Sequence, residues 1–146
     1  MRDDKRRSPT SFHKAGTSII LTANILAERV NTILKPYGIS EQQYNVLKVL
    51  EAHQGNPINL HSIQERMTNK MSNTTRLVDK LKQKGLAERV TCENNRRKVE
   101  ISITNEGIEL LKYVAPIMKV HITSTFKQIN IKEAEKLIAL LEKIGK

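Results

Sequence analysis

Residues 72–103 read SNTTRLVDKLKQKGLAERVTCENNRRKVEISI, and the period of their apolar residues changes within this stretch. Over residues 73–84 the apolar side chains recur every three or four positions, which indicates a helix with one buried face. Ser72 is the expected N-cap of this helix, and Gly85 is its expected C-terminal stop. From Leu86 on, apolar and polar residues alternate, as they do in half-buried strands. The stretch therefore predicts a helix followed by a β-hairpin, with strands at 86–91 and 99–103 and a polar tip at 92–98.

The segment before this helix completes a helix–turn–helix. Ser40 and Gln43 form a capping-box pattern that opens an earlier helix. A short helix over 61–67 and a tight connection at 68–71 then lead into the helix at 73–84. A helix–turn–helix followed by a hairpin is a winged helix. The predicted fold class is therefore mainly α (α+β), with a winged helix–turn–helix core at residues 40–103.

Long apolar helices flank this core. Residues 12–36 and 104–146 carry apolar side chains at helical spacing, and the first helix is apolar on more than one side. The core is too small to cover both helices, so we expect them to form the interface of a homodimer; packing within one monomer is the alternative. Pro116 lies inside the second region, where we expect a kink. Residues 1–11 are expected to form a flexible basic arm, which leaves 12–146 as a single domain.

The charge of the chain is unevenly distributed. The 146 residues have a formal net charge of +10, and residues 61–100 hold ten Lys and Arg against five Asp and Glu. Residues 15–60 are neutral. A concentrated basic segment favours an anionic partner, above all nucleic acid. Aromatic residues make up only 3% of the chain, which weakens the case for a single-strand or RNA binder, because such sites stack bases on aromatic rings.

The start of the helix at 73–84 carries short hydrogen-bonding side chains. An α-helix fits the major groove of DNA, and its N-terminal residues approach the base edges, where Ser, Asn and Thr can donate and accept hydrogen bonds. Two cations one turn apart point away from the apolar face, towards phosphates or bases. An ordinary capped helix with a solvated polar face is the alternative. The residues predicted to bind DNA here are Ser72, Asn73, Thr74, Arg76 and Lys80.

The hairpin tip is the second basic element. Arg96, Arg97 and Lys98 place three cations side by side, where they repel one another and gain nothing from burial. A narrow minor groove concentrates negative potential and attracts Arg side chains. We therefore predict that Asn95, Arg96 and Arg97 bind DNA; a solvated turn is the alternative.

Taken together, these motifs resemble those of the MarR (multiple antibiotic resistance regulator) family. The resemblance rests on the runs at 81–89, 95–99 and 103–107, in that order, and it extends over residues 12–146. It implies a winged-helix homodimer that regulates transcription, usually as a repressor, at a pseudo-palindromic operator in double-stranded DNA. The family commonly has an Asp before the two wing arginines. Asn95 stands there in this chain, so a hydrogen bond would replace an ion pair.

The expected mechanism follows from linkage. A small-molecule effector between the dimerisation helices and the winged core would release DNA by favouring one spacing of the two DNA-reading helices over another. The sequence does not identify the pocket residues. The alternative function is a winged-helix protein-interaction module that does not bind DNA, and a flat response of DNA affinity to salt would favour it.

Other functions find little support in the sequence. The four His are scattered, so we predict no metal site, and no Ser/His/Asp, Cys/His or phosphate-cradling Gly arrangement indicates an enzyme or a cofactor. Cys92 lies near the wing arginines, which favour a thiolate, but an unreactive strand-end Cys is the preferred interpretation over a redox sensor. The single Cys, the lack of a membrane-length apolar segment and the lack of a signal-peptide pattern lead us to expect a cytoplasmic protein.

Overall fold

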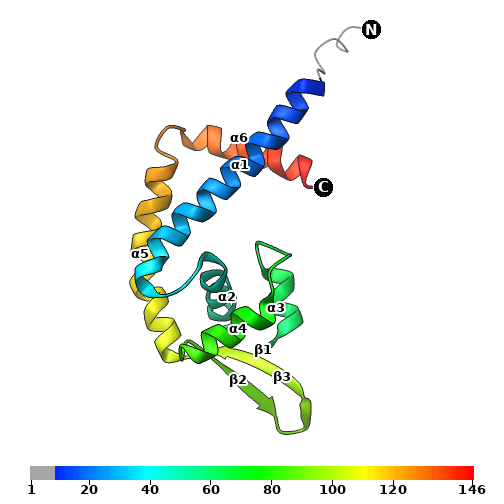
Figure 1. The fold of residues 1–146 in the computed structure, drawn as a ribbon, viewed down its shortest axis with the longest axis vertical. Coiled ribbons are helices and arrows are strands. Elements are labelled where there is room, and N and C mark those ends of the chain that lie inside the picture. The colour runs from blue at the N-terminus through cyan, green and yellow to red at the C-terminus, as the bar shows by residue number, and fades with distance from the viewer. Residues whose placement is uncertain (1–8) are drawn as a thin grey trace. The chain divides into compact units, whose positions relative to one another are not determined.

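The computed structural model describes residues 9–146, apart from the side chains of Pro9, Cys92, Arg96 and Arg97 (Figure 1). The chain divides into two compact units, with the boundary after Leu111. The element order matches the sequence prediction: mostly helix, with one small sheet. In chain order the elements are α1 (Pro9–Leu34), the 3-10 turn η2 (Lys35–Tyr37), α2 (Glu41–Ala52), β1 (Ile58–Asn59), α3 (Leu60–Arg66), α4 (Thr74–Gln83), β2 (Ala87–Cys92), β3 (Asn95–Ile103), α5 (Asn105–Thr125) and α6 (Ile131–Ile144).

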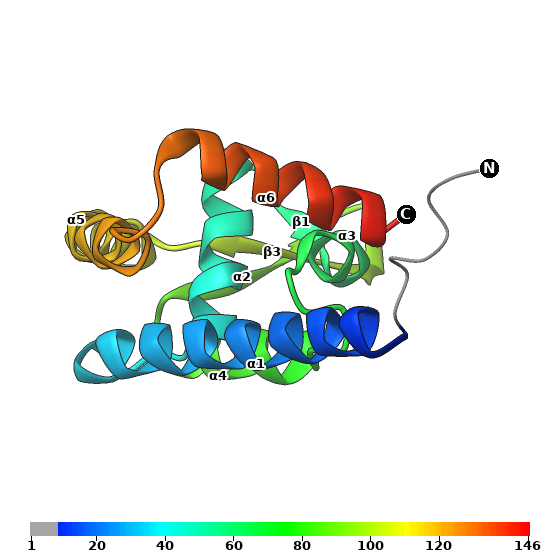
Figure 2. The ribbon, with the colours of Figure 1, turned by 90° about the horizontal axis from the view of Figure 1, so that it is seen from above.

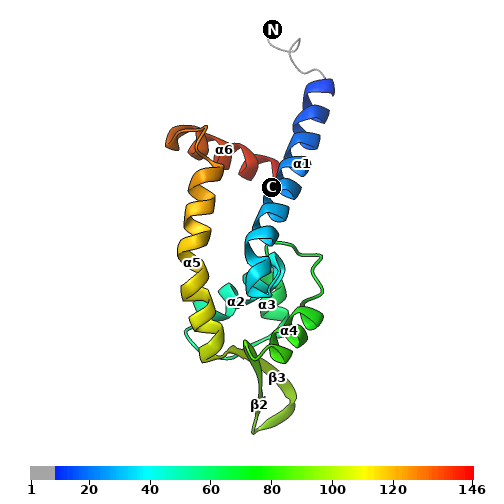
Figure 3. The ribbon, with the colours of Figure 1, turned by 60° about the vertical axis from the view of Figure 1, so that its left-hand side comes forward.

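A winged helix forms the centre of the first unit. The sheet is antiparallel, in the order β1–β3–β2, and the hairpin of β2 and β3 extends away from α2, α3 and α4 (Figure 3). The three helices bury their apolar faces against one another and the sheet, so the core is built from residues that the periodicity singled out. Its fully buried large side chains include Leu34, Leu47, Leu50, Ile63, Met67, Leu81 and Ile101.

Helix α1 begins earlier than the sequence predicted. Residues 9–11, which were expected to belong to the flexible arm, form its first turn, and residues 1–8 of that arm lie outside the described part of the chain. Pro9 is the first helical residue, where the missing N–H costs nothing and the fixed φ suits a helix. The helix ends as predicted, because η2 contains Pro36 and Gly38 follows with a φ of 71°.

The hairpin differs from its prediction at the tip. The expected polar loop of seven residues is reduced to Glu93 and Asn94, because β3 begins at Asn95. Thr91 pairs with Val99 and Cys92 pairs with Asn95, so the register shifts between these two pairs. The backbone of residues 96–98 therefore lies in β3 at an irregularity of the ladder. Polarity alone had suggested a loop there, but a bulged strand also leaves its backbone partly unpaired and tolerates polar side chains.

Helix α5 continues through Pro116 (Figure 2). The proline lies inside the helix without ending it. Leu111, Val114 and Met118 are buried, whereas Ala115, which also lies at helical spacing from Leu111, is exposed. Both Val114 and Ala115 fit a spacing of three or four residues from Leu111, and periodicity alone could not choose between them.

Apolar side chains on α1 and α6 remain uncovered in the single chain. Ile20 in α1 is 64% exposed and Ile144 in α6 is 67% exposed. Other large apolar residues exposed on these two helices are Phe12, Ile19, Leu21, Ile25, Ile131, Leu137, Ile138, Leu140 and Leu141. Large apolar side chains exposed in such number on one helix normally mark an interface.

Candidate nucleic-acid interface

Helix α4, the recognition helix of the helix–turn–helix, is capped by Asn73 and not by Ser72. The Asn73 Oδ1 atom accepts a hydrogen bond from the backbone N of Arg76 at 3.1 Å. Ser72 lies one residue earlier, is only 8% exposed, and its Oγ has no hydrogen-bond partner among the described residues. Ser and Asn are equally good caps, so the sequence could not decide which of two neighbours occupies the cap position.

Thr74 is buried as well, at 6% exposure, and its hydroxyl is used inside the protein. The Thr74 Oγ1 donates a hydrogen bond to the Oε1 of Gln64 on α3, and the Gln64 Nε2 donates to the carbonyl of Lys70 in the turn at 2.5 Å. Gln64 therefore connects α3, the turn and the first residue of α4. The burial of Ser72 and Thr74 leaves neither side chain accessible to a partner.

The exposed residues of α4 form a basic and polar face. Asn73, Arg76 and Lys80 are all exposed, and the first turn of the helix has no acidic residue. Thr75 is exposed too, although it was not among the residues predicted to bind DNA. Its position off the face formed by Leu77 and Leu81 was the available signal.

The wing supplies further basic residues. Asn95 and Lys98 are exposed on β3, and the Lys98 Nζ lies 3.4 Å from the Glu100 Oε1. Arg96 and Arg97 have their backbone in β3, and their side chains lie outside the described part of the structure, as does that of Cys92. The structure places the backbone of these residues in the wing, and their contacts with DNA stay a prediction.

An ion pair joins the recognition helix to the first wing strand. The Arg89 Nη2 on β2 lies 2.7 Å from the Asp79 Oδ1 on α4, with the two side chains 35% and 47% exposed. Exposed pairs of this kind add little to stability, usually less than about 1 kcal/mol. The pair links the hairpin directly to α4. The sequence analysis did not find this pair, because Asp79 and Arg89 lie on different elements.

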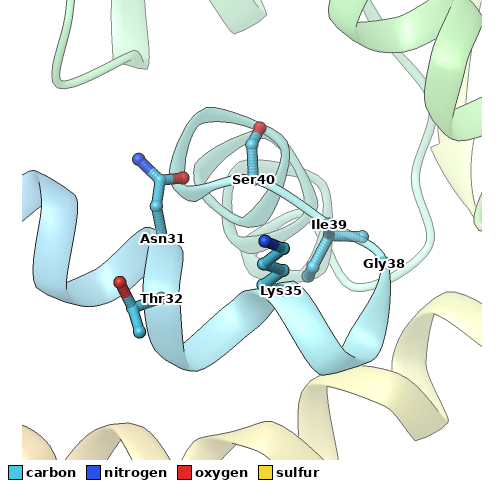
Figure 4. A pocket seen from close by; sticks show the side chains of 6 residues that line it. All are labelled: Asn31, Thr32, Lys35, Gly38, Ile39 and Ser40. Carbon is cyan, nitrogen blue, oxygen red and sulfur yellow. The ribbon is translucent and has the colours of Figure 1, made fainter.

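Two hollows flank the first turn of α2. One, of about 380 Å³, lies between this turn and α4, and is lined by Ser40, Gln42, Gln43, Asn73, Arg76, Leu77 and Lys80. The other, of about 420 Å³, lies where α1 meets α2, and is lined by Asn31, Thr32, Lys35, Gly38, Ile39 and Ser40 (Figure 4). Lys84, at the end of α4, links α4 to the start of α2, because its Nζ donates hydrogen bonds to the Gly38 carbonyl and to the Gln43 Oε1.

A third hollow, of about 290 Å³, lies beside Lys48 and Arg66. A hydrogen bond from the Lys48 ammonium to the Glu51 carboxylate, at 2.5 Å, raises the pKa of Lys48 above its ordinary value. Within the described residues, no three His, Cys, Asp or Glu side chains gather to hold a metal. No helix in that part of the chain is both long and apolar enough to cross a membrane.

Known proteins share both the sequence pattern and the fold. The MarR family model matches residues 39–99. An uncharacterised helix–turn–helix transcriptional regulator of Bacillus subtilis, YkoM, is 30% identical over 111 residues, which cover 76% of this chain and 71% of YkoM. The transcriptional repressor MprA of Escherichia coli is 27% identical over 119 residues, or 82% of this chain and 68% of MprA. A crystal structure of Staphylococcus aureus MepR with DNA has a TM-score of 0.79 at 21% identity, covering 88% of this chain and 94% of MepR.

These likenesses define the class of the protein as a winged helix–turn–helix transcriptional regulator, not an enzyme. The chain belongs to the MarR family.

Proposed function

We propose that two copies of this chain form a homodimer that binds a pseudo-palindromic operator in double-stranded DNA and represses transcription. The observation that carries the proposal is the exposed face of α4, where Asn73 and Arg76 lie at the start of a recognition helix that has no acidic residue in its first turn, and Lys80 follows in its last turn. Such a face is complementary to the major groove and its phosphates. The name of MprA, a transcriptional repressor, supports the direction of regulation.

The contacts we propose are divided between α4 and the wing. From α4 they are made by Asn73, Thr75, Arg76 and Lys80, and from the wing by Asn95, Arg96, Arg97 and Lys98. The buried residues Ser72 and Thr74 would act through the position of α4 rather than by touching DNA.

The exposed apolar faces of α1 and α6 support the homodimer. A second copy of the chain would cover these faces, and a two-fold axis would place two recognition helices on the same side of the assembly. Half-sites about one helical turn of DNA apart are then expected. Replacing Leu21, which is exposed on α1, by Glu should convert the dimer to a monomer in light scattering. An unchanged mass would contradict this interface.

The hollow at the α1–α2 junction is the proposed effector site. Figure 4 shows Asn31 and Lys35 directed towards the segment from Gly38 to Ser40, which links the dimerisation helix to the winged core. The Asn31 Oδ1 also accepts a hydrogen bond from the backbone N of Glu41 at 2.8 Å, so α1 is fastened to the start of α2. A small molecule that binds there more tightly in one arrangement of this joint would release DNA to the extent of that difference in affinity. A role at the chromosome also implies a cytoplasmic location.

The proposal is tested by DNA binding with matched variants. Genomic fragments selected by the protein are titrated in a gel-shift assay with the wild type and with Arg76→Ala and Arg97→Ala. Both variants should lose affinity while their circular dichroism and dimer mass stay unchanged. Lys127→Ala removes the same charge at an exposed position outside the winged core and should keep full affinity. Full affinity in both Arg variants, or an affinity that does not fall with salt, would instead favour a protein-interaction module.

A further inference from the structure

The hollow between α2 and α4, which we call the α2–α4 notch, has a mostly polar and basic lining. Of the residues that line it, two are cationic (Arg76 and Lys80), four are polar, and only Leu77 is apolar. None is acidic. The notch belongs entirely to the winged-helix unit and opens on the exposed face of α4.

The two cations of the notch have no acidic partner in the part of the chain that the structure describes. Neither Arg76 nor Lys80 forms an ion pair within the described residues. The acidic residue between them on α4, Asp79, is instead paired with Arg89 at 2.7 Å. Two unpaired positive side chains one turn apart repel each other, so a negative group placed between them is stabilised by both.

The first turn of α2 adds hydrogen-bond donors on the opposite wall. Two of its backbone amides are already used, since Glu41 N donates to the Asn31 Oδ1 and Gln43 N donates to the Ser40 Oγ. Gln42, the residue between them, lines the notch. The positive end of the α2 dipole therefore faces the same space as Arg76 and Lys80.

We propose that the α2–α4 notch holds one phosphate of the DNA backbone in each half-site, with Lys80 and Arg76 on one side and Gln42 on the other. This inference rests on the proposed function, and it changes the role of two residues within it. Arg76 and Lys80 bind the backbone and set the register of α4 on the duplex, whereas Asn73 and Thr75, nearer the N-terminus of the helix, are left to read the bases. A phosphate suits the notch because it presents several acceptor oxygens and no donor, which matches a lining of cations and amides.

The test compares variants of equal charge inside and outside the notch. Lys80→Ala and Lys82→Ala each remove one exposed Lys from α4, but only Lys80 lines the notch. Gln42→Glu and Gln83→Glu each add one negative charge, and only Gln42 lines it. Binding to a selected genomic fragment and to a mixed-sequence duplex is measured by fluorescence anisotropy over a range of salt concentrations.

Loss of one phosphate contact lowers the slope of log affinity against log salt by about 0.9, or by about 1.8 for a dimer with two notches. Lys80→Ala should show this decrease and weaken binding to both duplexes equally, and Gln42→Glu should do the same. Lys82→Ala and Gln83→Glu should leave the slope within about 0.5 of the wild-type value. Circular dichroism of each variant establishes that it is folded.

The outcomes separate the two proposals. Absence of wild-type binding to either duplex would overturn the proposed function and the notch with it. Wild-type binding with notch variants that match their controls would overturn the notch alone. A Lys80→Ala variant that loses affinity only for the selected fragment would show that Lys80 reads bases. Competition by free inorganic phosphate as strong as that by duplex DNA would show that the notch is a site for the free anion and not for the backbone.

Discussion

We expect the addition of one carbon atom at Gly107, by substitution with Ala, to destabilise the protein more than at the other glycines. Gly107 lies buried in the first turn of α5, where that helix meets the sheet. A Cβ at this position would lie 2.3 Å from the Leu86 carbonyl oxygen and 2.7 Å from the Ile103 Cγ1. Relief of both contacts requires a shift of about 1 Å, and the oxygen belongs to the backbone, so no side-chain rotation can provide it.

The surrounding hydrogen bonds resist this shift. The Leu86 oxygen accepts from Thr104 N at 3.2 Å, and the Thr104 Oγ1 donates to the Gly85 carbonyl at 2.6 Å and accepts from Gly107 N at 3.1 Å. Overpacking typically costs about 1–3 kcal/mol, and one lost hydrogen bond costs about 1 kcal/mol. Ala gains about 1 kcal/mol over Gly in helix propensity. We therefore expect Gly107→Ala to lower the free energy of unfolding by about 1–3 kcal/mol.

Urea unfolding followed by circular dichroism measures this change. Wild type and variant must be compared at the same protomer concentration, because dimerisation contributes to the apparent stability. The matched control is Gly16→Ala in α1, where a Cβ would meet nothing within 4 Å. This control should be as stable as the wild type or up to about 1 kcal/mol more stable. Equal midpoints for Gly107→Ala and Gly16→Ala would refute the steric argument.

Three further predictions concern the recognition helix. Ser72→Ala should leave DNA affinity unchanged and stability unchanged or slightly higher, because it removes a buried hydroxyl that has no partner among the described residues. Asn73→Ala should lower the free energy of unfolding by about 1 kcal/mol, because the helix loses its cap. Gel shifts measure the affinity of both variants, and urea midpoints measure their stability. Thr74→Val should lower the urea midpoint by the equivalent of about 1–2 kcal/mol and Thr74→Ser by less, since only Ser keeps the hydroxyl donor. Asp79→Asn should change the free energy of unfolding by less than about 1 kcal/mol. It should nevertheless weaken DNA binding, because Arg89 loses the partner that links the wing to α4. A loss of stability without a loss of DNA affinity would contradict this prediction.

The order of the elements was predictable because its signals are local. Capping boxes place all their partners within four residues, and the Ser40–Gln43 box is present with both of its hydrogen bonds. The change from helical to alternating period at Gly85 is equally local, and Gly85 has the expected positive φ of 71°. Such features depend on the backbone of one turn and are little affected by tertiary packing.

The candidate site was harder to predict because it is assembled from distant segments. The α2–α4 notch joins Gln42 to Arg76 and Lys80, and the pair of Asp79 and Arg89 joins a helix to a strand. The sequence identified the basic residues of α4 by type and spacing. The sequence could not show that the hydroxyl of Thr74, on the same turn, forms a hydrogen bond to Gln64 on another helix.

Ser40 lines both hollows beside α2, and this shared wall suggests how the two proposed sites communicate. On one side of Ser40 lies the α1–α2 junction, and on the other lies the face that would hold a DNA phosphate. Lys84 fixes the position of this wall from α4 through its bonds to Gly38 and Gln43. A molecule in the junction that displaces the first turn of α2 relative to α4 would break these bonds and change the distance between Gln42 and Lys80. Linkage makes the effect reciprocal, so the factor by which the effector lowers DNA affinity is the factor by which DNA lowers effector affinity.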